Sequence, residues 1–154
     1  MSTEGRQKHT YEYPRPALTV DVAIVTREAR PRILLIQRKK DPFAGSWALP
    51  GGFVEESEKL ADAARRELVE ETGVVVADLE QLYTVGNPGR DPRGWTVSVV
   101  YLAQVAPDAL KPVAADDASA VNWFPLDDLP AALAFDHAML VGRVRARLAD
   151  RAPD

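Results

Sequence analysis

The stretch from Gly52 to Val74 reads GFVEESEKLADAARRELVEETGV and predicts a glycine-started loop followed by one helix. Ser57 is expected to cap the start of that helix, because its hydroxyl can accept a free backbone N–H. Gly73 suits the position just past the helix end, where a left-handed backbone is common. We therefore expect the helix over residues 58–72.

Three carboxylates of this helix, those of Glu67, Glu70 and Glu71, lie three and four residues apart, so they meet on neighbouring turns. They border an apolar stripe that should face the core and that consists of Leu60, Ala61, Ala64 and Leu68. Clustered, half-buried carboxylates must be paired, protonated or bound to a cation. A hard divalent ion such as Mg²⁺ meets that need, and a solvated acidic surface is the alternative.

The spacing of this stretch resembles the Nudix box, the signature of the Nudix hydrolase family. The residues that match its defining positions are Gly52, Glu58, Arg66, Glu67, Leu68, Glu70, Glu71, Gly73 and Val74. The resemblance implies an α/β fold of the Nudix type, an α/β/α sandwich with a mixed central sheet and two main helices. It also implies hydrolysis of a pyrophosphate bond in a nucleoside diphosphate derivative.

The same resemblance implies a Mg²⁺ cofactor, with Mn²⁺ as an expected substitute. The expected metal ligands are the Gly52 carbonyl and the carboxylates of Glu67, Glu70 and Glu71. One of the last two, Glu70 or Glu71, is expected to act as the general base on a water nucleophile. Arg66 is expected to hold the carboxylates through charge-assisted hydrogen bonds, and Glu58 to support Arg66 or the metal.

A glycine- and proline-rich loop further along the chain reads Gly86-Asn87-Pro88-Gly89-Arg90-Asp91-Pro92-Arg93-Gly94. It resembles the GDPxRDPRG loop of a Nudix subgroup linked to NAD metabolism, which contains ADP-ribose pyrophosphatases and related transcriptional regulators. Asn87 replaces the usual aspartate, and Trp95 stands where a basic residue is common. Phe135-Asp136-His137-Ala138 resembles the same subgroup. The favoured substrate is therefore ADP-ribose, cleaved to AMP and ribose 5-phosphate.

Arginines are expected to contact the phosphate or ribose oxygens of this substrate, and they are Arg38, Arg90 and Arg93. A plain surface position is the alternative for each of them. Asp116 and Asp117 precede a predicted strand and are candidates for an extra metal ligand or base, or for a turn cap. His137, near the start of the last helix, is either structural or a member of the site.

Two other functions stay open. The first is a house-cleaning pyrophosphohydrolase that acts on oxidised nucleoside triphosphates. The second is an ADP-ribose-sensing, regulator-like domain without catalysis. Because only the final helix follows Ala134, we expect no DNA-binding domain here and no nucleic-acid partner. Family resemblance further suggests a homodimer with a nucleotide-type small-molecule substrate.

Bulk composition is ordinary for a soluble globular protein. The chain has 154 residues, 46% of them hydrophobic and 27% charged, which suits one globular domain over residues 17–150 after a flexible arm over residues 1–16. It has no cysteine, so disulfides and cysteine nucleophiles are excluded. The net charge of −4 argues against nucleic acid. No signal peptide or apolar span is visible, so we expect a cytoplasmic protein without a membrane partner.

Runs of β-branched and other apolar residues predict the remaining elements. Strands are expected at residues 18–26, 32–37, 95–105 and 120–124, extended segments at 74–76 and 79–85, and a final helix at 136–150.

Overall fold

A computed structural model describes residues 8–115 and 117–151 of the chain. Its strands are β1 (Ala17–Thr26), β2 (Arg32–Arg38), β3 (Trp47–Ala48), β4 (Gly51–Phe53), β5 (Glu80–Val85), β6 (Thr96–Val105) and β7 (Ala118–Pro125). Its helices are α1 (Leu60–Thr72) and α2 (His137–Arg151). The predicted strands and both helices are present, with their ends moved by one or two residues, but residues 74–76 form no strand.

The strands form one mixed sheet with the order β3-β2-β1-β6-β5, in which β4 also pairs with β1 and β7 with β2. The central pair, β1 with β6, is parallel and runs in register from Ala17 opposite Thr96 to Thr26 opposite Val105. The other pairs within the described strands are antiparallel. The expectation of a mixed central sheet is therefore confirmed.

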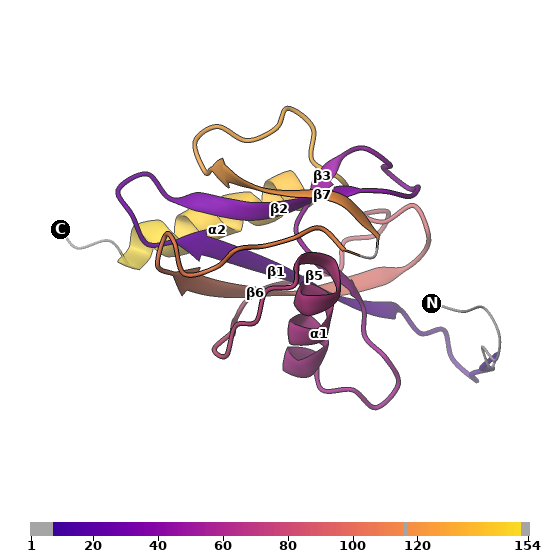
Figure 1. Ribbon diagram of the computed structural model, residues 1–154. Coiled ribbons are helices and arrows are strands. Elements are labelled where there is room, and N and C mark those ends of the chain that lie inside the picture. The colour runs from indigo at the N-terminus through magenta and orange to yellow at the C-terminus, as the bar shows by residue number, and fades with distance from the viewer. Residues whose placement is uncertain (1–7, 116, 152–154) are drawn as a thin grey trace.

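Alternate residues of β1 face opposite sides of the sheet, as the two-residue period of a strand requires. Val20, Val22 and Ile24 belong to the core cluster that contains Ala64 and Leu68 of α1. Ala23 and Val25 belong to the opposite cluster, which contains Leu140, Val141 and Val144 of α2. The two helices thus cover the two faces of the sheet, and the expected α/β/α sandwich is confirmed (Figure 1).

The start of α1 differs from the prediction. Lys59, not Ser57, occupies the N-cap position, and no side chain caps the helix there. Ser57 has a φ of 63° and lies in a turn between Glu55 and Glu58, in which the Glu55 N–H donates to Glu58 Oε1 at 3.0 Å. Because Glu58 is held in this turn, the helix begins only at Leu60. The predicted end is confirmed, since Gly73 has a left-handed φ of 71°.

Two short strands, β3 and β4, were not predicted from the sequence. They exist because the chain leading into α1 pairs with strands already in the sheet, with Trp47 opposite Gln37 and Gly52 opposite Val20. Short strands of this kind depend on tertiary partners rather than on their own residue pattern. Their consequence is functional, because β4 fixes the first glycine of the box against β1.

The predicted N-terminal arm is only partly described, because residues 1–7 lie outside the described part of the chain. Residues 8–16 are exposed throughout and precede β1. Over the described ranges, neither helix has the length and apolar character needed to cross a membrane.

Candidate active site

Two adjacent glycines, Gly51 and Gly52, bring β4 into close contact with its neighbours. A Cβ atom at Gly51 would overlap the Val20 carbonyl oxygen, and one at Gly52 would lie 2.5 Å from the Glu67 carboxyl carbon. A Cβ at Gly51 would collide with backbone, so that position requires glycine, whereas a Cβ at Gly52 would push the Glu67 carboxylate aside. The glycines thereby place the backbone of β4 directly against the carboxylates of α1.

Glu71 reaches from α1 to this backbone. Its Oε1 accepts a hydrogen bond from the Gly51 N–H at 3.2 Å, and the residue is only 7% exposed. Burial raises the pKa of Glu71 to about 9, because a carboxylate loses hydration when it leaves water. A buried carboxylate of this kind is stabilised in its charged form by a nearby cation.

Arg66 joins the remaining acidic residues of the box. Its Nε lies 2.7 Å from Glu58 Oε2, and its Nη1 lies 2.8 Å from Glu67 Oε1 and 3.3 Å from Glu70 Oε2. Nη2 also donates to the Phe53 carbonyl at 3.0 Å. Arg66 therefore connects α1 to the loop before it, and it makes the contacts with the carboxylates and with Glu58 that were expected of it.

The three glutamates differ in environment. The Glu67 side chain is 13% exposed and lies beside Gly52, and burial raises its pKa despite the contact with Arg66. The Glu70 side chain is 42% exposed. Glu71 alone of the three lines the neighbouring pocket. Glu67 and Glu71 therefore lie near Gly52, whereas Glu70 lies on the more exposed side of the helix.

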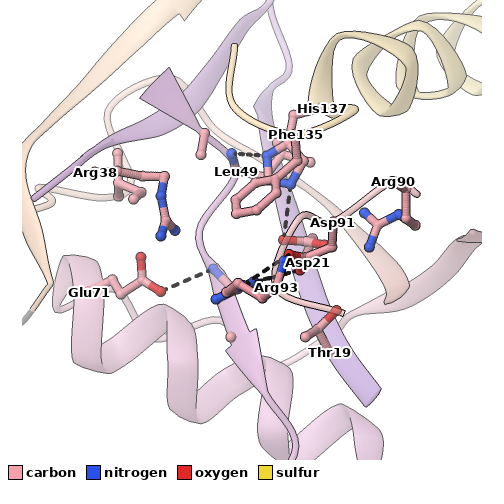
Figure 2. A pocket seen from close by; sticks show the side chains of 14 residues that line it. Thr19, Asp21, Arg38, Leu49, Glu71, Arg90, Asp91, Arg93, Phe135 and His137 are labelled. Carbon is pink, nitrogen blue, oxygen red and sulfur yellow. Dashed lines mark hydrogen bonds and ion pairs between the residues drawn. The ribbon is translucent and has the colours of Figure 1, made fainter. Parts of the chain in front are cut away.

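A small pocket of about 50 Å³ opens in front of Glu71 and the two glycines. Figure 2 shows its walls, which come from α1, β1, the end of β2, the loop over residues 86–94 and the start of α2. Arg38, Arg93 and Phe135 face Glu71 across it.

The guanidinium groups of Arg38 and Arg93 rest on one aromatic ring. Their Cζ atoms lie 5.0 Å and 5.1 Å from the centre of the Phe135 ring, and Arg93 also lies 4.7 Å from the centre of the Phe53 ring. Cation–π contact and planar packing restrict the motion of both groups. Two oriented guanidiniums in a pocket are suited to phosphate oxygens.

Arg90 lines the pocket from a buried ion pair. Its Nε and Nη2 donate to the two carboxylate oxygens of Asp136 at 2.8 Å and 2.7 Å, and its side chain is only 5% exposed. This bidentate contact ties the loop over residues 86–94 to the start of α2. Substrate contact by Arg90 stays a prediction.

The acidic candidates before β7 lie apart from this cluster or outside the described chain. Asp117 does not line the pocket and pairs with Lys40 at 3.3 Å, with its side chain 73% exposed. Asp116 lies outside the described residues. Their participation in metal binding therefore stays a prediction.

Asp21 also lines the pocket, and sequence reasoning missed it. It lies in the middle of β1 with 7% exposure and accepts a hydrogen bond from the Ser98 hydroxyl at 2.5 Å. Its Oδ1 lies 3.5 Å from Nε2 of His137. The available signal was a carboxylate inside an otherwise apolar, β-branched strand, because a buried charge needs a partner.

The residues around Gly52 fit a divalent cation by their chemistry. The oxygens of Glu67 and Glu71 and the backbone carbonyls of β4 form a hard donor set, which Mg²⁺ prefers. Among the described residues, no three acidic, histidine or cysteine side chains already converge as a metal site. Arg66 holds Glu67 and Glu70, and Gly51 holds Glu71, so these carboxylates would rotate on binding an ion.

The chain resembles known proteins in both sequence and structure. A model of the NUDIX domain matches residues 15–143. The chain is 44% identical over 129 residues to an ADP-ribose pyrophosphatase of Methanocaldococcus jannaschii, a match that covers 84% of this chain and 73% of that protein.

Two further matches are a transcriptional repressor and a solved NUDIX domain. The chain is 42% identical over 141 residues to the ADPR responsive transcriptional repressor NtrR of Acinetobacter baylyi, covering 89% of this chain but only 56% of the repressor. It also superposes on the NUDIX domain of Shewanella oneidensis NrtR, solved in complex with ADP ribose. That match has a TM-score of 0.79 and 42% identity, and it covers 88% of this chain and 90% of that domain.

Proposed function

The chain belongs to the Nudix family, and from that premise we propose that it hydrolyses ADP-ribose to AMP and ribose 5-phosphate with the help of Mg²⁺. One observation carries the proposal. A single pocket places the box residues Gly52 and Glu71 opposite two guanidiniums, those of Arg38 and Arg93. Acidic groups that suit a metal and basic groups that suit phosphates therefore face the same space.

In this proposal Glu67, Glu71 and the Gly52 carbonyl hold the metal, with Glu70 at its edge. A bound Mg²⁺ would neutralise phosphate oxygens and lower the pKa of the attacking water. Before the ion binds, hydrogen bonds from Arg66 keep Glu67 and Glu70 beside this position. Mn²⁺ is expected to substitute, since it shares the preference for carboxylate and carbonyl oxygens.

Glu70 is the proposed general base. Its side chain is the most exposed of the three glutamates, and its contact with Arg66, at 3.3 Å, is longer than that of Glu67. It is therefore the carboxylate most available to a water molecule. The water oxygen forms a bond to one phosphorus, the bridging P–O bond breaks, and the water's proton passes to Glu70.

Arg38 and Arg93 are proposed to bind the diphosphate. Both guanidiniums border the pocket and lie against Phe135, while Arg38 also donates to the Pro42 carbonyl and Arg93 to the Asp91 carboxylate, each at 2.8 Å. Charge-assisted hydrogen bonds to phosphate oxygens fit this arrangement. The 44% identity to an ADP-ribose pyrophosphatase supports ADP-ribose over other nucleoside diphosphate derivatives.

A second candidate function is ADP-ribose sensing without turnover. It is favoured by the 42% identity to an ADPR-responsive repressor, of which this chain spans 56%. The complete set of box residues supports turnover instead, since a sensor needs the binding pocket but not the catalytic carboxylates.

A substrate panel tests these possibilities. Purified protein is incubated with ADP-ribose or with oxidised nucleoside triphosphates, with Mg²⁺ or Mn²⁺, and the products are resolved by chromatography. AMP from ADP-ribose supports the proposal, whereas pyrophosphate and a nucleoside monophosphate from the triphosphates indicate the house-cleaning activity. Tight binding of ADP-ribose without any product indicates a sensor, and operator binding by this chain would add a nucleic-acid partner.

We also propose that the protein is a cytoplasmic homodimer without a nucleic-acid partner. Family resemblance supports the dimer, and the net charge of −4 supports the absence of nucleic acid. Sedimentation equilibrium gives the mass of the assembly directly. A mass of one chain, 16.9 kDa, would exclude the dimer.

A further inference from the structure

Three consecutive residues before and at the start of α2 reach three different parts of the pocket wall. The ring of Phe135 packs against the guanidiniums of Arg38 and Arg93. Asp136 holds Arg90, and His137 contacts the segment that leads into β4. This helix lies on the face of the sheet opposite to α1, which carries the box. The wall of the site is therefore built jointly by both helices.

His137 makes the contact closest to the glycines. Its Nδ1 accepts a hydrogen bond from the Leu49 N–H at 3.0 Å, and its Nε2 lies 3.5 Å from Asp21 Oδ1 (Figure 2). The residue is 3% exposed, and Leu49 is 2% exposed. Burial lowers the pKa of His137, so the ring is neutral near pH 7 and keeps a lone pair on Nδ1. Leu49 thus donates to an acceptor that carries no proton.

Each residue from Leu49 to Gly51 is fixed by a different element. The Leu49 N–H binds His137 of α2, and the Pro50 carbonyl accepts from the Val22 N–H of β1 at 2.8 Å. The Gly51 N–H binds Glu71 of α1. The next residue is Gly52, whose backbone touches Glu67. Only Pro50 and Gly51 separate Leu49 from Gly52, so a shift at Leu49 must be absorbed by the dihedral angles of these few residues and changes the backbone path into Gly52.

We propose that His137 is a positioning residue, which sets the backbone of Gly51 and Gly52 for metal binding by holding Leu49 from the opposite side of the sheet. The inference rests on the proposed function in one respect, since it takes the Gly52 carbonyl and the carboxylates of α1 as the metal site. A residue that orients a metal-binding group without touching the ion commonly changes metal affinity by about tenfold or more.

Three substitutions separate this role from simple packing. In His137→Asn, the amide oxygen can replace Nδ1 as the acceptor for Leu49. In His137→Gln, the longer side chain places its polar group nearer to Asp21 than to Leu49. His137→Phe keeps the ring volume and removes both contacts. The matched control is His9→Phe, because His9 is the only other histidine of the chain and is exposed.

The measurement is Mn²⁺ binding by titration calorimetry in the absence of substrate, with thermal unfolding recorded for every variant. We expect His137→Asn and the control to stay within about twofold of wild type, and His137→Gln and His137→Phe to bind about tenfold more weakly. Equal affinity in all folded variants would overturn the proposal. So would equal weakening in all three substitutions at position 137, or their common failure to fold, because the role would then be packing alone.

The same titration keeps this inference distinct from the proposed function. If wild type binds Mn²⁺ with the expected pattern among variants but releases no AMP from ADP-ribose, the substrate assignment fails and the positioning role stands. If wild type does not bind Mn²⁺, the positioning role fails. If wild type cleaves ADP-ribose and the variants bind Mn²⁺ alike, only the positioning role fails.

Discussion

The carboxyl carbon of Glu67 lies 2.5 Å from the point that a Cβ atom would occupy at Gly52. Backbone and carboxylate are therefore in contact across the gap between β4 and α1, and a larger residue at position 52 would displace the carboxylate. This contact joins the two parts of the proposed metal site, a main-chain carbonyl and a glutamate from a helix.

Replacement of Gly52 by alanine tests that contact. The added methyl group forces Glu67 or β4 to move, so we expect Gly52→Ala to lower Mn²⁺ affinity and ADP-ribose turnover by about tenfold or more. Gly142→Ala is the control, because a Cβ at Gly142 meets no atom within 4 Å. This control, in the middle of α2, should gain about 0.5–1 kcal/mol of stability, as measured by urea unfolding. Unchanged metal affinity in Gly52→Ala would contradict the proposed ligand set.

The metal-free protein should become less stable as pH rises, through Glu71. Its folded-state pKa of about 9 exceeds the ordinary value of 4.5, so the native state keeps a proton that the unfolded chain releases between these values. Below pH 4.5 both the folded and the unfolded state carry the proton, so Glu71 does not make the unfolding free energy depend on pH there. Above it the unfolding free energy falls with each pH step until about pH 9.

Thermal unfolding in EDTA between pH 5 and pH 9 measures this effect. Relative to Glu71→Gln, wild type should lose stability progressively over the window, and added Mg²⁺ should restore it in wild type more than in the variant. A difference between the two proteins that does not vary with pH would show that Glu71 ionises normally in the fold.

Arg66 should be hard to replace even by lysine. A single ammonium group cannot reproduce its contacts with Glu58, Glu67 and the Phe53 carbonyl, because it lacks the planar fork. We expect Arg66→Lys to lower the unfolding free energy by about 1–3 kcal/mol, measured by denaturant titration. The neighbouring Arg65→Lys, on an exposed side chain, should change it by less than about 0.5 kcal/mol. Equal losses of unfolding free energy in Arg66→Lys and Arg65→Lys would show that the contacts of Arg66 contribute no special stability.

Arg38 and Arg90 should respond differently to substitution by glutamine. Arg38→Gln removes a pocket charge, so we expect the KM for ADP-ribose to rise about tenfold with little change in Tm. Arg90→Gln leaves the Asp136 carboxylate without its partner and should cost about 2 kcal/mol of stability. Steady-state kinetics measure the KM of both variants, and thermal unfolding measures their stability. A destabilised Arg38→Gln with normal KM would reverse the assignment of roles.

Local sequence was sufficient for the parts of the fold that local physics determines. The apolar stripe, the three glutamates and Gly73 predicted α1 and its end, because each depends on residues within a few turns. The predicted start of α1 was wrong because the Glu58 side chain bonds back to the Glu55 N–H and to Arg66. The preference of serine for helix caps cannot reveal these contacts.

The contacts within the site that the sequence did not reveal are long-range. Asp21 of β1, Leu49 between β3 and β4, and His137 of α2 come together, and the hydrogen bond between Leu49 and His137 spans 88 residues. Strand alternation would place Asp21 on a face but could not indicate that His137 lies there. Similarly, β4 becomes a strand only because β1 offers a partner. Such contacts follow from the assembled sheet, not from any window of the sequence.

The most direct measurement is the release of AMP from ADP-ribose by wild type and by Glu70→Gln, side by side at saturating Mg²⁺. We predict AMP and ribose 5-phosphate in equal amounts from wild type, and at least a hundredfold slower release from Glu70→Gln at an unchanged Tm. No AMP from wild type, or undiminished release from Glu70→Gln, would contradict hydrolysis by the carboxylates of α1.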